Sequence, residues 1–338
     1  MISVPVLVAL IVTFVATLLG TRAFARFAVA NGIVANPNFR SLHERPMPRA
    51  GGIVFSSTFL LTAGALGWAL ETDPLLMSTL LGGGAAAALF GLADDLVQLR
   101  SVTQLGAQAV LAAFALASGG GEPVVDMPWA PRWLDMLFNW AGFVWLLNAY
   151  NFMDGVDGMA AAGSVFFSLT VILLLRLSGA DPTLTAFLAV FAASVLAFAF
   201  LNWPPASIFM GSAGSYFLGY SYCALMAYTA SRGYLSFWAW LVILGYFVGD
   251  TTTTTVLRMF VTERWYGAHR SHAYQNLARV WRSHTRVVVG VTLYHALWLL
   301  PLVLWMTFSP KVTPVAVALA LGPVVVWTLR YGPRFSSS

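Results

Sequence analysis

Long apolar runs separated by short polar connections dominate the pattern along the chain. About 17 to 25 mostly apolar residues suffice for a helix to cross a bilayer. Runs of this kind lie near 3–20, 52–70, 75–93, 103–118, 133–150, 159–178, 183–203, 213–230, 235–255, 287–308 and 312–330. The pattern predicts an all-α polytopic membrane protein of about eleven transmembrane helices. It forms one domain over residues 1–338, with cytoplasmic loops near 21–51, 94–102, 151–158, 204–212 and 256–286.

Composition supports the membrane interpretation. Hydrophobic residues make up 59% of the chain and charged residues only 9%, whereas soluble domains carry about 25% charged residues. Cys223 is the single cysteine, which excludes an internal disulfide and an all-cysteine metal site. Arg22 and Arg26 follow the first apolar run instead of preceding it. That order differs from a cleavable signal peptide, so the first run is expected to remain as a span.

The cationic residues are distributed unevenly over the two sides of this predicted topology. Fourteen of the 18 Lys and Arg residues fall on one side, and only Arg132, Arg176, Arg232 and Lys311 fall on the other. The positive-inside rule then places the N-terminus in the periplasm and the C-terminus in the cytoplasm. It also accounts for the basic pI of about 9.6 without nucleic acid, for which no motif is present. The unusual polar segments all fall on this arginine-rich side, which predicts one cytoplasmic site.

The segment "NAYNFMDGVDGMAA" places Asn148, Asn151, Asp154 and Asp157 at every third position between two apolar runs. Residues three apart share a helical face, and the glycines of the segment are expected to break the helix so that both aspartates turn inward. Hard oxygen ligands of this kind suit Mg²⁺. A polar turn between two spans would also use "DG", but it does not explain asparagines inside an apolar run.

Asp94 and Asp95 end the third span in "LFGLADDLVQLRS". Carboxylates near hydrocarbon cost about 3 kcal/mol each on insertion scales, and one acid would suffice to end a span. Neighbouring helical residues diverge by about 100°, so one acid is expected to be a ligand and the other a base or an outer group.

Two further segments supply cations. "RWYGAHRSHAYQNLARVWR" carries His269, His272, Arg264 and Arg270, and "RSLHERPMPRAGGI" carries His43, Arg45 and Arg49. Such side chains can clamp phosphate oxygens. A basic loop that merely obeys the sidedness rule would explain the arginines equally well, but it explains the histidines less well. Phe209, before the turn "MGSAGS", could stack on a base or simply pack, and for Asp250 a structural role is as plausible as catalysis.

In this order the segments "PNFRSLHERPMPRAGG", "GLADD", "NAYNFMDGVDGMAA", "FMGSAGS" and "HRSHAYQ" resemble the polyprenyl-phosphate N-acetylhexosamine-1-phosphate transferases of glycosyltransferase family 4. The similarity covers nearly the whole chain. It implies transfer of a sugar 1-phosphate from a UDP-N-acetylhexosamine to undecaprenyl phosphate in the bacterial inner membrane. The histidine segment is most similar to the branch that initiates O-antigen synthesis, whose sugars include 6-deoxy forms. Mg²⁺, with Mn²⁺ as an alternative, and a homodimer are also implied.

The resemblance implies roles for individual residues. It makes Asp94, Asp95, Asp157, His269 and His272 catalytic, and it assigns Asp94, Asp154 and Asp157 to the metal. Substrate binding falls to the set His43, Arg45, Arg49, Asn148, Asn151, Asp154, Phe209, Arg264 and Arg270, with Phe209 on uracil.

One position departs from the family pattern. Ser212 stands where the family has an aspartate ligand, and a hydroxyl is a poorer Mg²⁺ ligand than a carboxylate. Either the chain is an inactivated variant, natural or engineered, or Asp154 and Asp157 provide more of the coordination. Weak activity is therefore expected. The alternatives to an enzyme are a membrane transporter, which would carry its acids near the midplane, and a non-catalytic homologue.

Overall fold

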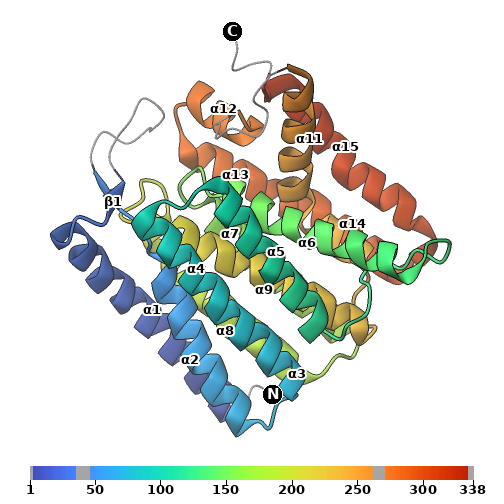
Figure 1. Cartoon of the computed structure of the whole chain (residues 1–338), viewed down its shortest axis with the longest axis horizontal. Coiled ribbons are helices and arrows are strands. Elements are labelled where there is room, and N and C mark those ends of the chain that lie inside the picture. The colour runs from blue at the N-terminus through green and yellow to red at the C-terminus, as the bar shows by residue number, and fades with distance from the viewer. Residues whose placement is uncertain (1–2, 36–45, 262–270, 334–338) are drawn as a thin grey trace.

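The computed structural model describes residues 3–35, 46–261 and 271–333 and is mostly helical, with one short strand pair (Figure 1). Its helices are α1 (Val4–Ala30), α2 (Gly52–Ala69), α3 (Pro74–Met77), α4 (Gly84–Val97), α5 (Ser101–Ser118), α6 (Arg132–Met153), α7 (Met159–Leu177), α8 (Pro182–Asn202), α9 (Gly211–Ser231), α10 (Phe237–Ile243), α11 (Gly245–Val261), α12 (Ala273–Val280), α13 (His284–Tyr294), α14 (Leu300–Phe308) and α15 (Thr313–Tyr331). Two π-helical segments, η1 (Ser78–Gly83) and η2 (His295–Leu299), join α3 to α4 and α13 to α14, and the 3₁₀ turn η3 (Pro310–Val312) precedes α15.

Among the described residues, eight helical stretches are long and apolar enough to cross a membrane by length and composition. They are Val4–Ala30, Gly52–Ala69, Pro74–Val97, Ser101–Ser118, Met159–Leu177, Pro182–Asn202, His284–Phe308 and Pro310–Tyr331. The other three predicted runs coincide with the helices α6, α9 and α10–α11. The multi-pass helical architecture is thus supported, whereas eleven spans and the orientation of the termini stay predictions.

One predicted boundary is wrong. The loop expected from residue 21 begins only after α1 ends at Ala30, because the alanine-rich sequence around Arg22 and Arg26 continues as helix. The following chain includes β1 (Val34–Ala35), which pairs antiparallel with β2 (Met47–Pro48).

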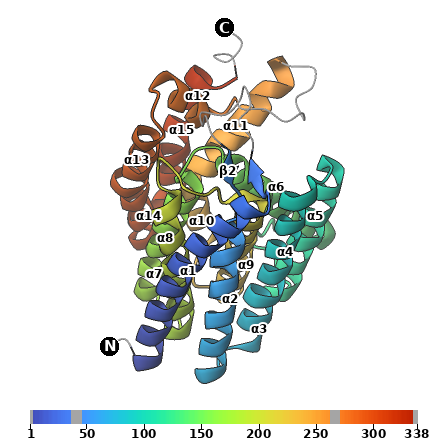
Figure 2. The same cartoon turned by 90° about the vertical axis from the view of Figure 1, so that its left-hand side faces the viewer.

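Helix α9 occupies the centre of the bundle. Nearly every residue from Ala213 to Thr229 is buried, and α9 packs against α2, α4, α5 and α6 (Figures 1 and 2). Helices α7 and α8 lie together, with α1 covering α8, while α11 packs on α15.

Glycines bring two helices very close to the first turn of α9. A Cβ on Gly91 of α4 would lie 2.2 Å from the carbonyl oxygen of Ser212, and a Cβ on Gly52 of α2 would lie 2.1 Å from the nitrogen of Gly214. Small residues permit such backbone approach between membrane helices. The approach puts the acidic end of α4 directly beside the start of α9.

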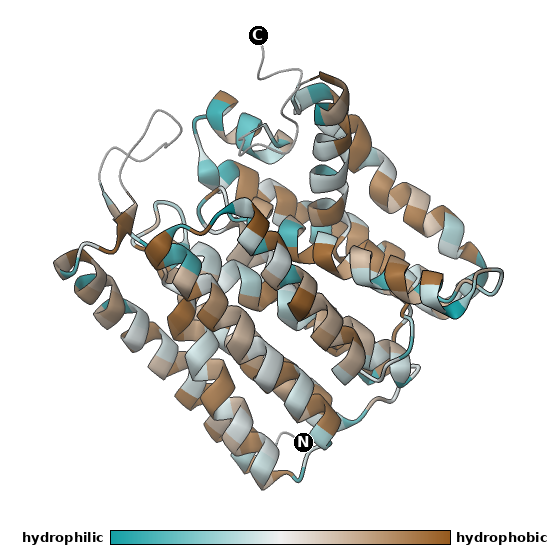
Figure 3. Cartoon of the chain, viewed as in Figure 1, coloured by the Kyte–Doolittle hydropathy of each residue, from teal (hydrophilic) through white to brown (hydrophobic). Residues whose placement is uncertain are grey.

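A short backbone ladder completes this end of the bundle. Phe209 donates its N–H to the carbonyl of Pro48, and Gly51 and Gly52 donate theirs to the carbonyls of Phe209 and Met210. The segment before α2 is therefore fixed to the connection between α8 and α9. The turns and α12 at this end are among the most hydrophilic parts of the chain (Figure 3).

Substituting Gly91→Ala should lower the free energy of unfolding by about 1–3 kcal/mol, because the added methyl overpacks the α4–α9 contact. Thermal denaturation in detergent measures this change. Gly106→Ala on α5 is the matched control, since its Cβ would meet no atom within 4 Å. Equal melting temperatures for the two variants would contradict the close packing.

Candidate active site

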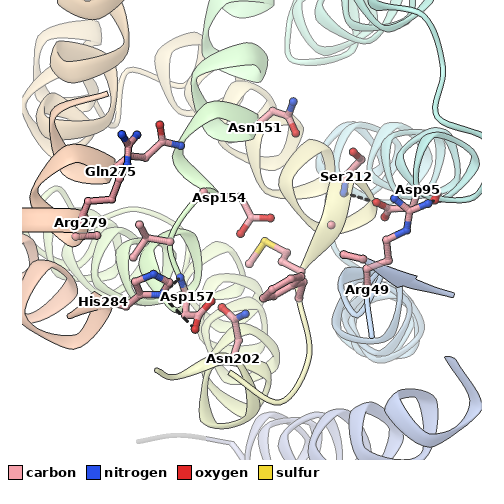
Figure 4. Close-up of a pocket in the computed structure, with 17 residues that line it drawn as sticks. Arg49, Asp95, Asn151, Asp154, Asp157, Asn202, Ser212, Gln275, Arg279 and His284 are labelled. Atoms are coloured by element: carbon pink, nitrogen blue, oxygen red, sulfur yellow. Dashed lines mark hydrogen bonds and ion pairs between the residues drawn. The ribbon is translucent and has the colours of Figure 1, made fainter. Parts of the chain in front are cut away.

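A polar pocket of about 310 Å³ opens where the helix ends gather. Its walls come from five separate parts of the chain: the strand–α2 segment with Arg49, the end of α4 with Asp95, the α6–α7 connection, the α8–α9 connection, and α12 with the start of α13. The sequence segments expected to form one site therefore meet in one pocket. Figure 4 shows the Asp154 carboxylate in the middle of the pocket, between Ser212 and Asp95 on one side and Asp157 and His284 on the other.

The α6–α7 connection breaks as the glycines predict. Helix α6 ends at Met153 and α7 begins at Met159, and Gly158 adopts a φ of +76°, a conformation that favours glycine. Asn151, in the last turn of α6, accepts a hydrogen bond from Ser215 Oγ at 3.0 Å. The connection thus delivers Asn151, Asp154 and Asp157 to the pocket.

Asp154 sits in an environment that disfavours its negative charge. Burial raises the pKa of Asp154 well above its ordinary value, and the carboxylates of Asp95 and Asp157 raise it further. The backbone of Gly211 donates a hydrogen bond that opposes part of this shift. Three carboxylates around one pocket make a place where a cation would be stabilised.

Asp157 is held from two sides. Its Oδ2 accepts a hydrogen bond from the Ala206 N–H at 3.2 Å and lies 3.2 Å from Nδ1 of His284. The backbone N–H of Asp157 also points at this Nδ1, at 3.3 Å. Nδ1 can accept that N–H only when it carries no hydrogen, and it can donate to the carboxylate only when it carries one. The buried amide of Asn202 accepts from the Gly158 N–H and donates to the carbonyl of Ile208, each at 3.0 Å. Asp157 therefore joins both connections to the start of α13.

The two acids of α4 have different surroundings, as neighbouring positions on a helix require. Asp95 accepts the N–H groups of Ser212 and Ala213, each at 3.0 Å, at the N-terminus of α9. Asp94 lies outside the pocket lining and accepts from the Leu99 N–H at 3.0 Å and from Gln104 at 2.8 Å. Asp95 is therefore the acid of this pair that faces the pocket.

Ser212 lines the pocket but also reaches Asp94. Its Oγ donates a hydrogen bond to Oδ2 of Asp94 at 2.6 Å. A carboxylate at this position would lie beside both acids of α4. The serine replaces that repulsion with a hydrogen bond.

Arg49 and Phe209 both line the pocket. Arg49 donates from Nη2 to the backbone carbonyl of Asp95, so its cation lies beside the acidic end of α4. The stacking of Phe209 on a base stays a prediction.

Two further predicted residues, His272 and Asn148, lie outside the pocket lining. His272 is 1% exposed and contacts Asp250 at 3.4 Å, away from the pocket lining. Asn148 also lies outside the lining and donates to Gln108 on α5. The residues His43, Arg45, Arg264, His269 and Arg270 lie outside the described residues.

The pocket also contains residues that sequence reasoning missed: Asn202, Gln275, Arg279 and His284. Asn202 carried a usable signal, because it is a polar residue at the end of an apolar run, as Asn151 is. Arg279 stood inside the basic segment without being singled out. His284 had no signal of its own, since only the fold brings the start of α13 to Asp157.

Comparisons with known proteins place these features in a family. A model of glycosyl transferase family 4 matches residues 77–230. A Bacillus subtilis protein named "Probable undecaprenyl-phosphate N-acetylglucosaminyl 1-phosphate transferase" is 30% identical over 296 residues, covering 85% of this chain and 81% of that protein. The chain belongs to glycosyl transferase family 4.

Two further relatives in the family match over most of their length. The decaprenyl-phosphate N-acetylglucosaminephosphotransferase of Mycobacterium tuberculosis is 28% identical over 334 residues, covering 87% of this chain and 80% of that protein. The undecaprenyl-phosphate alpha-N-acetylglucosaminyl 1-phosphate transferase of Thermotoga maritima is 24% identical over 261 residues, covering 77% of each.

The positions of the carboxylates decide whether the pocket could hold a divalent metal ion. Within the described parts of the chain, no three or more His, Cys, Asp or Glu side chains are grouped as a metal site, and Asp94 does not join Asp154 and Asp157 in the pocket lining. Mg²⁺, however, usually takes only one or two protein carboxylates together with substrate phosphates and water. Asp154 and Asp157 fit that requirement, since both line the pocket and the pKa of Asp154 is raised by burial and by the neighbouring carboxylates of Asp95 and Asp157.

Substituting His284→Ala should lower the free energy of unfolding by about 1–3 kcal/mol, because a buried carboxylate loses a polar neighbour. His284→Gln, which keeps a hydrogen-bonding group, should lose less. Thermal denaturation compares both variants with Arg286→Gln, an exposed substitution on the same helix. If His284→Ala and Arg286→Gln have the same melting temperature, the contact between His284 and Asp157 does not stabilise the fold.

Proposed function

We propose that this chain transfers an N-acetylhexosamine 1-phosphate from a UDP-sugar to a polyprenyl phosphate, undecaprenyl phosphate in a bacterial inner membrane, and releases UMP. The observation that carries the proposal is the pocket itself. It combines Asp95, Asp154 and Asp157 with Arg49 and Arg279 at one end of an apolar helical bundle. Membership of the family and the printed activities of the relatives support the same reaction.

The chemistry requires two anionic substrates to meet. An oxygen of the lipid phosphate attacks the β-phosphorus of the UDP-sugar, a new P–O bond forms, and the bond to the UMP oxygen breaks. One diphosphate replaces another, so the equilibrium should lie near neutral. Catalysis of this kind is mainly positioning and charge neutralisation. Arg49 and Arg279 can bind phosphate oxygens, and Asn151 can orient a substrate hydroxyl or amide through hydrogen bonds.

Asp154 and Asp157 are the residues that would hold Mg²⁺, or Mn²⁺ in its place. The ion would neutralise diphosphate oxygens as the bond to UMP breaks. Burial and, after it, the carboxylates of Asp95 and Asp157 raise the pKa of Asp154, and a bound cation would relieve the part that comes from those carboxylates. The magnesium requirement therefore belongs to the proposal.

The membrane setting follows the same reasoning. A polyprenyl tail needs an apolar environment, while the nucleotide sugar arrives from water. A pocket at the ends of the helices meets both needs, and the excess of arginine on this side of the chain supports a cytoplasmic orientation. A role in starting O-antigen or another surface polysaccharide, a 6-deoxy sugar donor and a homodimer come from the sequence resemblance and remain part of this proposal.

The reaction is tested with the purified chain in nanodiscs, supplied with Mg²⁺, undecaprenyl phosphate and a panel of UDP-N-acetylhexosamines. We expect at least one donor to release UMP in equal amount to a lipid-linked product, and added UMP to reverse the reaction. Asp154→Asn should lower the rate by about 100-fold or more, because it removes a carboxylate from the reacting centre. UMP release without lipid phosphate would contradict the proposal. Failure of every donor with both the chain and its Ser212→Asp variant would also contradict it.

The Ser212→Asp variant tests the departure from the family pattern. The new carboxylate would lie beside Asp94 and Asp95, since the serine already contacts Asp94 through Oγ and Asp95 through its N–H. We therefore expect this variant to transfer sugar phosphate about tenfold faster or more in saturating Mg²⁺, and to melt at a lower temperature when the cation is removed. Ser212→Asn, similar in size but uncharged, is the control and should gain neither property. Equal rates for the serine and aspartate forms would show that position 212 does not bind the metal.

A further inference from the structure

The broken end of α6 leaves backbone groups that need partners. In a continued helix, the N–H of Gly155 would donate to the carbonyl of Asn151, and the carbonyl of Phe152 would accept from Val156. Helix α6 instead ends at Met153. The break creates the turn that carries Asp154. The turn is therefore stable only if the Gly155 N–H and the Phe152 carbonyl find other hydrogen-bond partners.

The hydroxyl of Tyr274 satisfies both groups. It donates to the carbonyl of Phe152 at 2.5 Å and accepts from the N–H of Gly155 at 3.0 Å. Gln275 Nε2 also lies 3.2 Å from this hydroxyl as a donor. One phenol oxygen can donate once and accept twice, so its capacity is filled. Asp154 lies between the two backbone groups that the hydroxyl joins.

Gly155 is the position that lets this hydroxyl approach. A Cβ there would lie 2.6 Å from the Tyr274 hydroxyl oxygen and 2.2 Å from Gln275 Nε2. The first glycine of "DGVDG" therefore leaves room for the ends of the Tyr274 and Gln275 side chains, which a Cβ at this position would force to move.

Helix α12 is itself anchored. The buried carboxylate of Asp250 on α11 accepts from the N–H of Ala273 at 3.1 Å and from Thr328 on α15 at 2.9 Å. Asn276 donates to the carbonyls of Tyr331 and Gly332. Tyr274 is fully buried, so its hydroxyl is held in place by elements on both sides.

We propose that Tyr274 is a positioning residue of this enzyme, whose hydroxyl closes the break at the end of α6 and thereby fixes Asp154 in the pocket. The proposal rests on the proposed function for its catalytic consequence. Its structural consequence, the ordering of residues 151–158, stands without it. It also gives Asp250 a role, because its hydrogen bonds to Ala273 and Thr328 hold α12, and with it Tyr274, in position.

The test compares Tyr274→Phe with Tyr220→Phe. Tyr220 is equally buried, its hydroxyl donates to the carbonyl of Thr79 at 2.9 Å, and Gly83 packs closely on it, in a different part of the bundle from the pocket. Both substitutions therefore remove a buried hydroxyl that donates to a backbone carbonyl, and Tyr274→Phe also removes the two hydrogen bonds that its hydroxyl accepts. Hydrogen–deuterium exchange of residues 151–158 is the first measurement, and transfer kinetics, in whichever of the chain and Ser212→Asp turns over, is the second.

We expect Tyr274→Phe to exchange the Gly155 amide about tenfold faster or more and to lower kcat by about 10–100-fold, with a smaller change in KM. Tyr220→Phe should change neither, although it too should lower the melting temperature because it leaves a buried carbonyl without its donor. In a double-mutant cycle, Gly155→Ala and Tyr274→Phe should be non-additive, because both disturb one contact.

Unchanged exchange at residues 151–158 in Tyr274→Phe would overturn the positioning role, as would an equal loss of kcat in Tyr220→Phe. Faster exchange in a protein that transfers no sugar phosphate in any form would instead leave the positioning of Asp154 intact and overturn the proposed function.

Discussion

The rest of the site depends on the hydrogen bonds between the N-terminus of α9 and the carboxylate of Asp95. Two backbone N–H groups point at one carboxylate, and the dipole of a helix favours negative charge at this end. The carboxylate can reach them only because Gly91 lets α4 approach α9. An acid that would be costly in an apolar bundle is thereby stabilised, and it fixes the distance between the α4 end and the pocket.

Several walls of the pocket are made by helices that end or begin at one end of the bundle. Helix α6 stops before Asp154, α8 stops at Asn202, and α9 begins after a ladder to the segment before α2. Continuous helices would have satisfied their own backbone and offered only side chains. Breaks expose backbone donors and acceptors, and these are satisfied by Asp95, Asn202 and Tyr274. The polar network of the pocket is therefore also what terminates the helices.

Much of this was predictable from residue types and their spacing. The apolar runs gave the helices, "DGVDG" gave the break, and Arg49, Asp95, Asn151, Asp154, Asp157, Phe209 and Ser212 all line the pocket. The direction of a side chain at a helix end was harder to predict, because it depends on which neighbours the helix packs against. Asn148 lies one turn from Asn151 and contacts Gln108 instead of the pocket. His272 lies within the basic segment and contacts Asp250, while His284, further along, reaches Asp157.

The lining of the pocket is divided unevenly along the chain. The part matched by the family model, residues 77–230, contains Asp95, Asp154 and Asp157. Arg49 comes before that part, and Gln275, Arg279 and His284 come after it. The anionic and the cationic sides of the pocket therefore come from different stretches of the chain, and they meet only when the whole bundle folds.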